Sequence, residues 1–138
     1  MKLNAIILIG IYLVLAGCDE NPVTKENNGL LGIWQWTKSS GGIAYMERTP
    51  ESEGLTMFLE LKSDSTYRKI VDGSLQSEGT FSIANEPTIF GQDPLPVIRF
   101  EHETMPMAIM TLNQTTLLLW ENCTDCFGHE YSRNNFLD

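Results

Sequence analysis

Eight short runs rich in aromatic and β-branched residues follow one another along most of the chain. Gly, Asn, Asp, Ser and Pro separate these runs, and no segment repeats apolar residues at the helical spacing of i, i+3, i+4 and i+7. Runs of this kind are typical of β-strands. We expect strands at Leu31–Lys38, Leu55–Lys62, Thr66–Val71, Glu78–Ile83, Pro96–Glu101, Met107–Leu112, Thr115–Glu121 and His129–Arg133.

Several connections between these strands are short enough for hairpins. Ser63-Asp64-Ser65, Asp72-Gly73-Ser74 and Asn113-Gln114 each supply residues that tolerate turn geometry. Eight antiparallel strands in this order can close on themselves, and closure removes the exposed edges that would otherwise pair with other chains. The sequence therefore predicts an all-β fold, an eight-stranded antiparallel up-and-down β-barrel. An open sandwich is the alternative.

The alternation within the strands predicts which side chains face the interior. Residues two apart on a strand share a face. In a wide barrel, the inward apolar residues would line an apolar pocket, with an aromatic residue of the long 39–54 loop as its lid. In a narrow barrel, the same residues would form an ordinary packed core. The candidate ligand-binding residues are Trp36, Tyr45, Met57, Leu59, Ile98 and Phe100.

The first eighteen residues have the layout of a secretory signal. Lys2 gives a positive start, Ala5 to Leu15 is an apolar run of eleven residues, and small residues precede Cys18. Eleven residues are too few for a helix to cross a hydrocarbon core of about 30 Å. Leu15-Ala16-Gly17-Cys18 resembles the lipobox of bacterial lipoproteins. The resemblance implies that residues 1–17 are removed and that Cys18 is lipidated.

A lipidated cysteine implies a location and a layout for the mature protein. We expect attachment to a membrane of the cell envelope, with the outer membrane favoured and the domain facing the periplasm or the exterior. Residues 18–28 are polar beyond Cys18 and predict a flexible tether, and residues 29–138 form the barrel domain. The chain carries a formal net charge of −9, and loss of Lys2 makes it −10. This acidity argues against nucleic acid as a partner.

The first and the last predicted strands each carry a short motif. Gly32-Ile33-Trp34 opens the first strand, and Tyr131-Ser132-Arg133 closes the last. Together with the lipobox, these motifs resemble the small lipocalin-like lipoproteins of Gram-negative bacteria. The resemblance implies that Arg133 packs over Trp34 at one end of the barrel, and a cation stacked on a large buried indole is a structural pair on physical grounds as well. The Thr-Asp-Tyr signature of ligand-carrying lipocalins is missing.

Cys123-Thr124-Asp125-Cys126 occupies the last connection. Three interpretations are open: a local disulfide, a metal site completed by His129 and His102, and a redox-active dithiol. We favour the disulfide, because disulfides persist in an exported protein and no helix is present to activate a thiol.

The sequence contains no motif that indicates catalysis. There are two histidines, and Gly-x-Ser-x-Gly, P-loop and Gly-x-Gly-x-x-Gly motifs are absent. We expect no catalytic residue, resident metal or cofactor. The predicted function is a membrane-anchored, non-enzymatic binding module for a small apolar ligand. The alternative is a structural lipoprotein with a filled barrel that contacts other envelope proteins through its loops, and a metal-binding or redox accessory role through Cys123 and Cys126 comes third.

Overall fold

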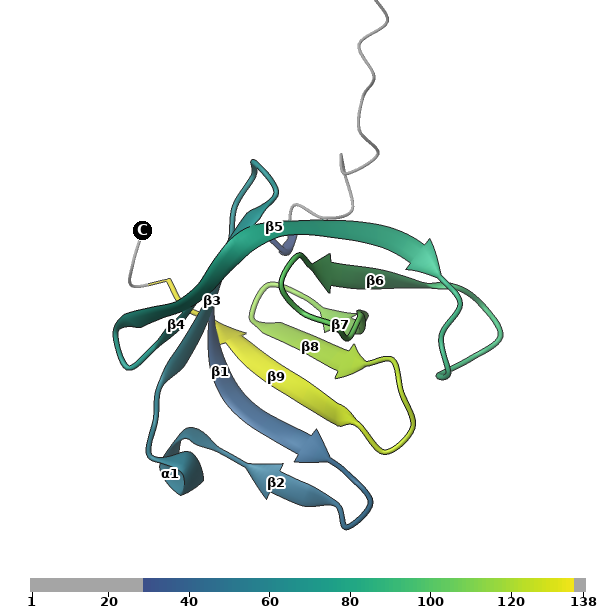
Figure 1. Cartoon of the computed structure of the whole chain (residues 1–138), viewed down its shortest axis with the longest axis horizontal. Helices are drawn as coiled ribbons and strands as arrows, with labels where there is room; N and C mark the ends of the chain where they lie inside the picture. Colours follow the sequence, from purple (N-terminus) through teal and green to yellow (C-terminus); the bar gives the residue numbers. More distant parts are fainter. Residues whose placement is uncertain (1–28, 136–138) are drawn as a thin grey trace, which may run out of the picture.

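Eight strands close into an antiparallel β-barrel in the computed structural model, which describes residues 29–135 (Figure 1). Neighbouring strands follow chain order, and the last strand pairs with the first. The all-β class and the eight-stranded up-and-down barrel predicted from the sequence are thereby confirmed. The barrel strands are β1 (Gly32–Gly41), β3 (Met57–Leu61), β4 (Thr66–Val71), β5 (Ser74–Glu86), β6 (Leu95–Phe100), β7 (Met107–Leu112), β8 (Thr116–Glu121) and β9 (Phe127–Arg133).

The predicted signal peptide, the lipidated Cys18 and the tether all lie outside the described residues. They remain predictions from the sequence.

Each predicted strand overlaps one barrel strand, but β5 is longer than predicted. It begins at Ser74 and ends at Glu86, whereas the prediction covered Glu78–Ile83. The first half of β5 pairs with β4 and the second half with β6, up to Glu86↔Leu95. Backbone pairing with β4 and then with β6 therefore holds β5 along its whole length. Its first residues are too polar to show an apolar pattern in the sequence.

Two short elements between β1 and β3 were not predicted. Strand β2 (Met46–Arg48) pairs with the end of β1, and α1 (Pro50–Glu53) is a single helical turn. The turn begins where Thr49 and Ser52 exchange side-chain hydrogen bonds with each other's backbone N–H, with proline at the first helical position. Among the described residues, no helix has the length and hydrophobicity needed to span a membrane.

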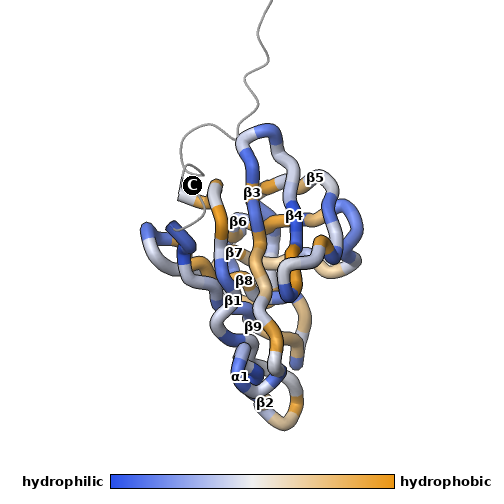
Figure 2. The backbone as a smooth tube through the Cα atoms, turned by 90° about the vertical axis from the view of Figure 1, so that its left-hand side faces the viewer, coloured by the Kyte–Doolittle hydropathy of each residue, from blue (hydrophilic) through white to orange (hydrophobic). Residues whose placement is uncertain are grey.

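The core contains side chains from every barrel strand, together with Leu30. The strands carry most of the hydrophobic stretches in Figure 2, whereas α1 and the β3–β4 loop are hydrophilic. Burial of this apolar surface is the main favourable term in folding. The buried core residues are Leu30, Trp34, Trp36, Leu59, Leu61, Tyr67, Phe81, Ile98, Phe100, Met107, Ile109, Leu117, Leu119 and Tyr131.

One end of the barrel is sealed by the pair that the two terminal motifs predicted. The guanidinium carbon of Arg133 lies 4.1 Å from the ring centroid of Trp34, which is fully buried and donates its indole N–H to the Leu30 carbonyl at 2.7 Å. Arg133 also donates to the carbonyls of Leu31 and Gly29. Gly32 is required here, because a Cβ would lie 2.7 Å from Arg133 Nη1 and its φ is +127°.

The ladder between β6 and β7 is the shortest in the barrel. Only Val97↔Ala108 and Ile98↔Met107 pair across it, whereas each of the other barrel ladders has at least four pairs. The connection after β6 therefore turns away from β7 early. This leaves space inside the end of the barrel opposite Trp34 and Arg133.

Candidate ligand-binding pocket

A pocket of about 470 Å³ occupies the open end of the barrel, beside the short β6–β7 ladder. Its volume lies within the usual range for small-molecule sites. Eight of the ten lining residues have a nitrogen or oxygen in the side chain, and the two methionines are the exceptions. The lining residues are Met57, Lys69, Gln76, Ser77, His102, Glu103, Met107, Glu121, His129 and Tyr131.

An ion pair stands on one wall of this pocket. Lys69 of β4 contacts Glu103 of the β6–β7 connection, and 15% of the lysine side chain and 25% of the glutamate side chain are exposed. The Lys69 ammonium also lies 5.3 Å from the ring centroid of Phe100. Partial burial strengthens both contacts relative to a surface pair. The positive charge of Lys69 is therefore already balanced within the protein.

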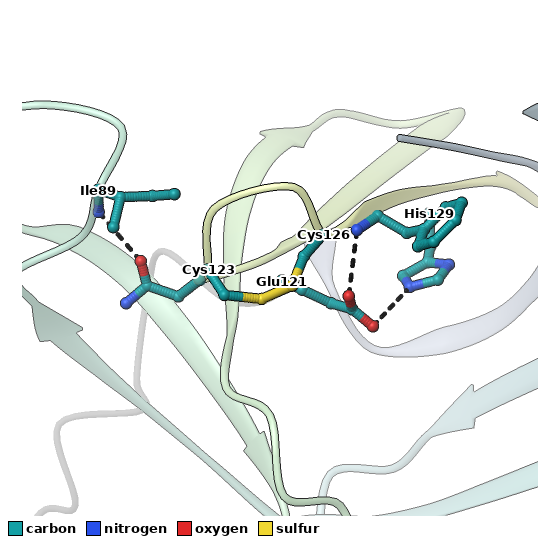
Figure 3. Close-up of a disulfide and its surroundings, with 7 residues drawn as sticks. Ile89, Glu121, Cys123, Cys126 and His129 are labelled. Atoms are coloured by element: carbon teal, nitrogen blue, oxygen red, sulfur yellow. Dashed lines mark hydrogen bonds and ion pairs between the residues drawn. A yellow bond between two sulfur atoms is a disulfide. The ribbon is translucent and has the colours of Figure 1, made fainter. Parts of the chain in front are cut away.

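A chain of hydrogen bonds runs from the core to the opposite wall. The indole N–H of Trp36 donates to Ser39 Oγ at 2.8 Å, and Ser39 Oγ lies 2.7 Å from His129 Nδ1. His129 Nε2 lies 3.4 Å from Glu121 Oε1, and Glu121 Oε2 accepts the backbone N–H of Phe127 at 3.1 Å (Figure 3). Because an indole N–H only donates, Ser39 accepts it and is free to direct its own hydrogen to Nδ1. His129 then directs Nε2–H to Glu121.

Burial sets the protonation of two groups on this wall. It lowers the pKa of His129, although the neighbouring Glu121 carboxylate acts in the opposite direction. Burial also raises the pKa of Tyr131 well above its ordinary value, with the negative charge of Glu103 adding to the effect. Tyr131 therefore stays a neutral phenol. The neutral form of His129 agrees with the direction of the hydrogen-bond chain.

The loop after Glu121 is closed by Cys123 and Cys126. The two sulfur atoms lie at disulfide distance, with Cα atoms 5.6 Å apart, as the favoured interpretation predicted (Figure 3). Asp125 takes a left-handed conformation with φ +60°, which allows the tight turn. The end of β1 packs directly against this loop at Gly41, where a Cβ would lie 2.2 Å from the Cys126 carbonyl oxygen. The disulfide thus fixes the start of β9 beside Glu121.

The residues predicted to bind a ligand are distributed over three environments. Met57 lines the pocket. Tyr45 is 70% exposed between β1 and β2 and does not line the pocket. The other four face inward, as the alternation predicted, and they belong to the packed core: Trp36, Leu59, Ile98 and Phe100.

Sequence reasoning missed most of the pocket wall, although a signal for it is present. Toward the open end, the inward series changes from apolar to polar. Lys69 comes two residues after Tyr67, Glu121 two after Leu119, and His129 two before Tyr131. Charged residues in a strand's inward series indicate the point where a barrel interior becomes solvated.

Comparison with known proteins gives no identification, because no protein-family model, curated protein or solved structure matches the chain.

Proposed function

We propose that this protein is a non-enzymatic binding module, anchored to a membrane of the cell envelope by the lipidated Cys18, which takes a small polar molecule into the open end of its barrel. The observation that carries the proposal is a pocket of about 470 Å³ in a barrel whose other end is sealed. The resemblance to lipocalin-like lipoproteins supports both the anchor and the use of the barrel interior.

The position of Gly29, the first described residue, supports the same arrangement. Gly29 accepts a hydrogen bond from Arg133, so the chain enters the domain at the sealed end. The proposed anchor therefore joins the barrel on the side away from the pocket. An anchor at that end leaves the mouth of the pocket open to solvent.

The lining favours a polar ligand over the apolar one expected from sequence. An apolar molecule would remove water from the carboxylates and imidazoles without replacing their hydrogen bonds, which is costly. One lysine faces two glutamates, so the lining has a formal charge of −1 with the imidazoles counted as neutral. Glu103 pairs with Lys69, whereas Glu121 forms no ion pair with a lysine or arginine among the described residues. We therefore propose a small organic amine, with its ammonium directed at Glu121.

The test is thermal stability of the full chain in the presence of small amines, small carboxylic acids and fatty acids. A ligand that binds only the folded state raises Tm with its concentration. We expect stabilisation by one or more amines, its loss in Glu121→Gln, and its retention in Glu47→Gln, a matched change on the exposed strand β2. Stabilisation by fatty acids alone would refute the polar ligand.

A second candidate function is contact with another envelope protein through the β1–β2 hairpin. Ile43 is 91% exposed, and Tyr45 lies beside it on the same turn. The hairpin projects from the barrel at the bottom of the view in Figure 1. Clustered exposed apolar residues commonly mark interaction sites. We expect Ile43→Ser with Tyr45→Ser to abolish chemical cross-linking to envelope proteins if this function holds, and unchanged cross-linking would argue against it.

A further inference from the structure

Three possible metal ligands gather where β8 ends. One carboxylate oxygen of Glu121 and the Sγ atoms of Cys123 and Cys126 all lie within 4.8 Å of one another. Figure 3 shows the Glu121 side chain lying between the disulfide and His129. The sequence alone indicated His102 as a possible partner of the cysteines, but His102 does not belong to this group. The structure places Glu121 there instead.

His129 is the candidate fourth donor. Its ring nitrogens lie outside the group of ligand atoms that are all within 4.8 Å of one another, so the reduced sulfur atoms would have to approach it. Its Nε2 lies 3.4 Å from Glu121 Oε1. In a tetrahedral zinc site, bond lengths of about 2.0–2.3 Å separate neighbouring donors by roughly 3.3–3.8 Å. His129 and Glu121 therefore already have the spacing of two zinc ligands. The two sulfur atoms are bonded in the disulfide, and after reduction they would need to separate to about 3.8 Å.

The far side of the His129 ring is already supported. Its Nδ1 lies 2.7 Å from Ser39 Oγ, and Ser39 is itself buried. A histidine that ligates a metal usually directs its other ring N–H to a fixed acceptor, which sets the tautomer and the orientation of the ring. Ser39 Oγ has two acceptor sites, so it can accept from Trp36 and from Nδ1–H together.

We propose that the dithiol form of this protein binds one divalent cation of the zinc class through Cys123, Cys126, Glu121 and His129. Thiolate and imidazole ligands favour zinc over magnesium or calcium. This site shares Glu121 with the amine proposed for the pocket, but it does not rest on that proposal, because the two cysteine thiolates define it. It makes disulfide formation and metal binding alternative states of the same loop, because bonded sulfur atoms have no thiolate to offer.

Conversion of the disulfide form into the metal-binding dithiol form requires a reductant, which is an external dithiol. The disulfide takes two electrons and two protons from that dithiol, which becomes a disulfide in turn. The two new thiols then release their protons to solvent as their sulfur atoms bind the cation. Glu121 binds as a carboxylate without proton loss. The single ring proton of His129 moves from Nε2 to Nδ1, where Ser39 accepts it.

The experiment titrates the full chain with Co²⁺ as a spectroscopic probe and then with Zn²⁺ as competitor, before and after anaerobic reduction. We expect the reduced protein to bind one Co²⁺, with thiolate-to-cobalt charge-transfer absorption that Zn²⁺ abolishes. The oxidised protein should show no such absorption. Absence of the absorption in the reduced, folded protein would overturn the proposal.

Variants assign the remaining ligands. Glu121→Gln and His129→Gln should each weaken Co²⁺ binding by at least roughly tenfold. Loss of a residue that only hydrogen-bonds to a metal ligand already has an effect of about that size. His102→Gln is the matched control, because this second imidazole lines the same pocket but, unlike His129, forms no hydrogen bond with Glu121 among the described contacts. Circular dichroism checks that each variant keeps its strands. Unchanged affinity in both Glu121→Gln and His129→Gln would overturn the four-ligand site and leave the cysteines alone as ligands.

Discussion

Arg133→Ala tests whether the two terminal motifs stabilise the barrel as a pair. The guanidinium stacks on the fully buried Trp34 with 4.1 Å between its central carbon and the ring centroid, and it donates at 2.9 Å to the Leu31 carbonyl in a partly buried position. The stack is worth about 1 kcal/mol, and a charged hydrogen bond contributes about 1.5 kcal/mol. The remaining donors reach exposed carbonyls that water can satisfy. We therefore expect a loss of about 2–3 kcal/mol in the free energy of unfolding.

The assay is urea unfolding followed by tryptophan fluorescence, with a thermal melt beside it. For a domain of this size, the loss lowers Tm by on the order of 10 °C. Arg99→Ala is the matched control, because Arg99 forms a two-point ion pair with Glu86 at the surface and has no aromatic partner among the described contacts. Its effect should be much smaller. A change below about 0.5 kcal/mol in Arg133→Ala would refute the stacking argument, because ordinary surface substitutions stay within that range.

Three further changes test other parts of the molecule. Gly32→Ala should destabilise the barrel by about 1–3 kcal/mol in urea unfolding, because its Cβ meets Arg133 and its φ of +127° strains any side chain; wild-type stability would contradict this. Burial lowers the pKa of His129 in the folded state, so the unfolded state binds more protons, and the free energy of unfolding should fall as the pH drops below about 6.5. His129→Gln should reduce the slope of stability against pH between pH 7.5 and 5.5. An unchanged slope would exclude His129 as the group responsible. Cys18→Ala should move the protein from the membrane to the soluble fraction, and retention in the membrane would refute the predicted anchor.

The barrel could be predicted from sequence because each strand carries its own signal. Alternation places apolar residues on the inward face regardless of what the rest of the chain does, and turn residues separate the strands. The terminal motifs also predicted the contact between Trp34 and Arg133, since the first strand begins and the last strand ends at one end of the barrel. In contrast, β2 and α1 are too short to give a periodic pattern.

The hydrogen-bond chain of the pocket could not be predicted from alternation. With Trp34 and Trp36 facing inward, alternation directs Lys38 inward and Ser39 outward. A register shift between Trp36 and Lys38 reverses this, and Ser39 is buried while Lys38 is not. His129 lies 90 residues further along the chain, so its contact with Ser39 exists only once β1 and β9 have paired around that shift.

The two-pair ladder between β6 and β7 also determines how the barrel can move. A closed barrel is expected to open first at the ladder that has the fewest paired residues. The amide hydrogens along this seam should exchange with solvent before those of the longer ladders, because local opening costs least where the fewest pairs must break. The pocket lies beside the β6–β7 ladder. Its mouth can therefore widen while the stacking contact between Trp34 and Arg133, at the other end of the barrel, stays intact. We therefore predict that the opening of this one ladder, and not the resting width of the rim, limits the size of the ligand proposed for the pocket.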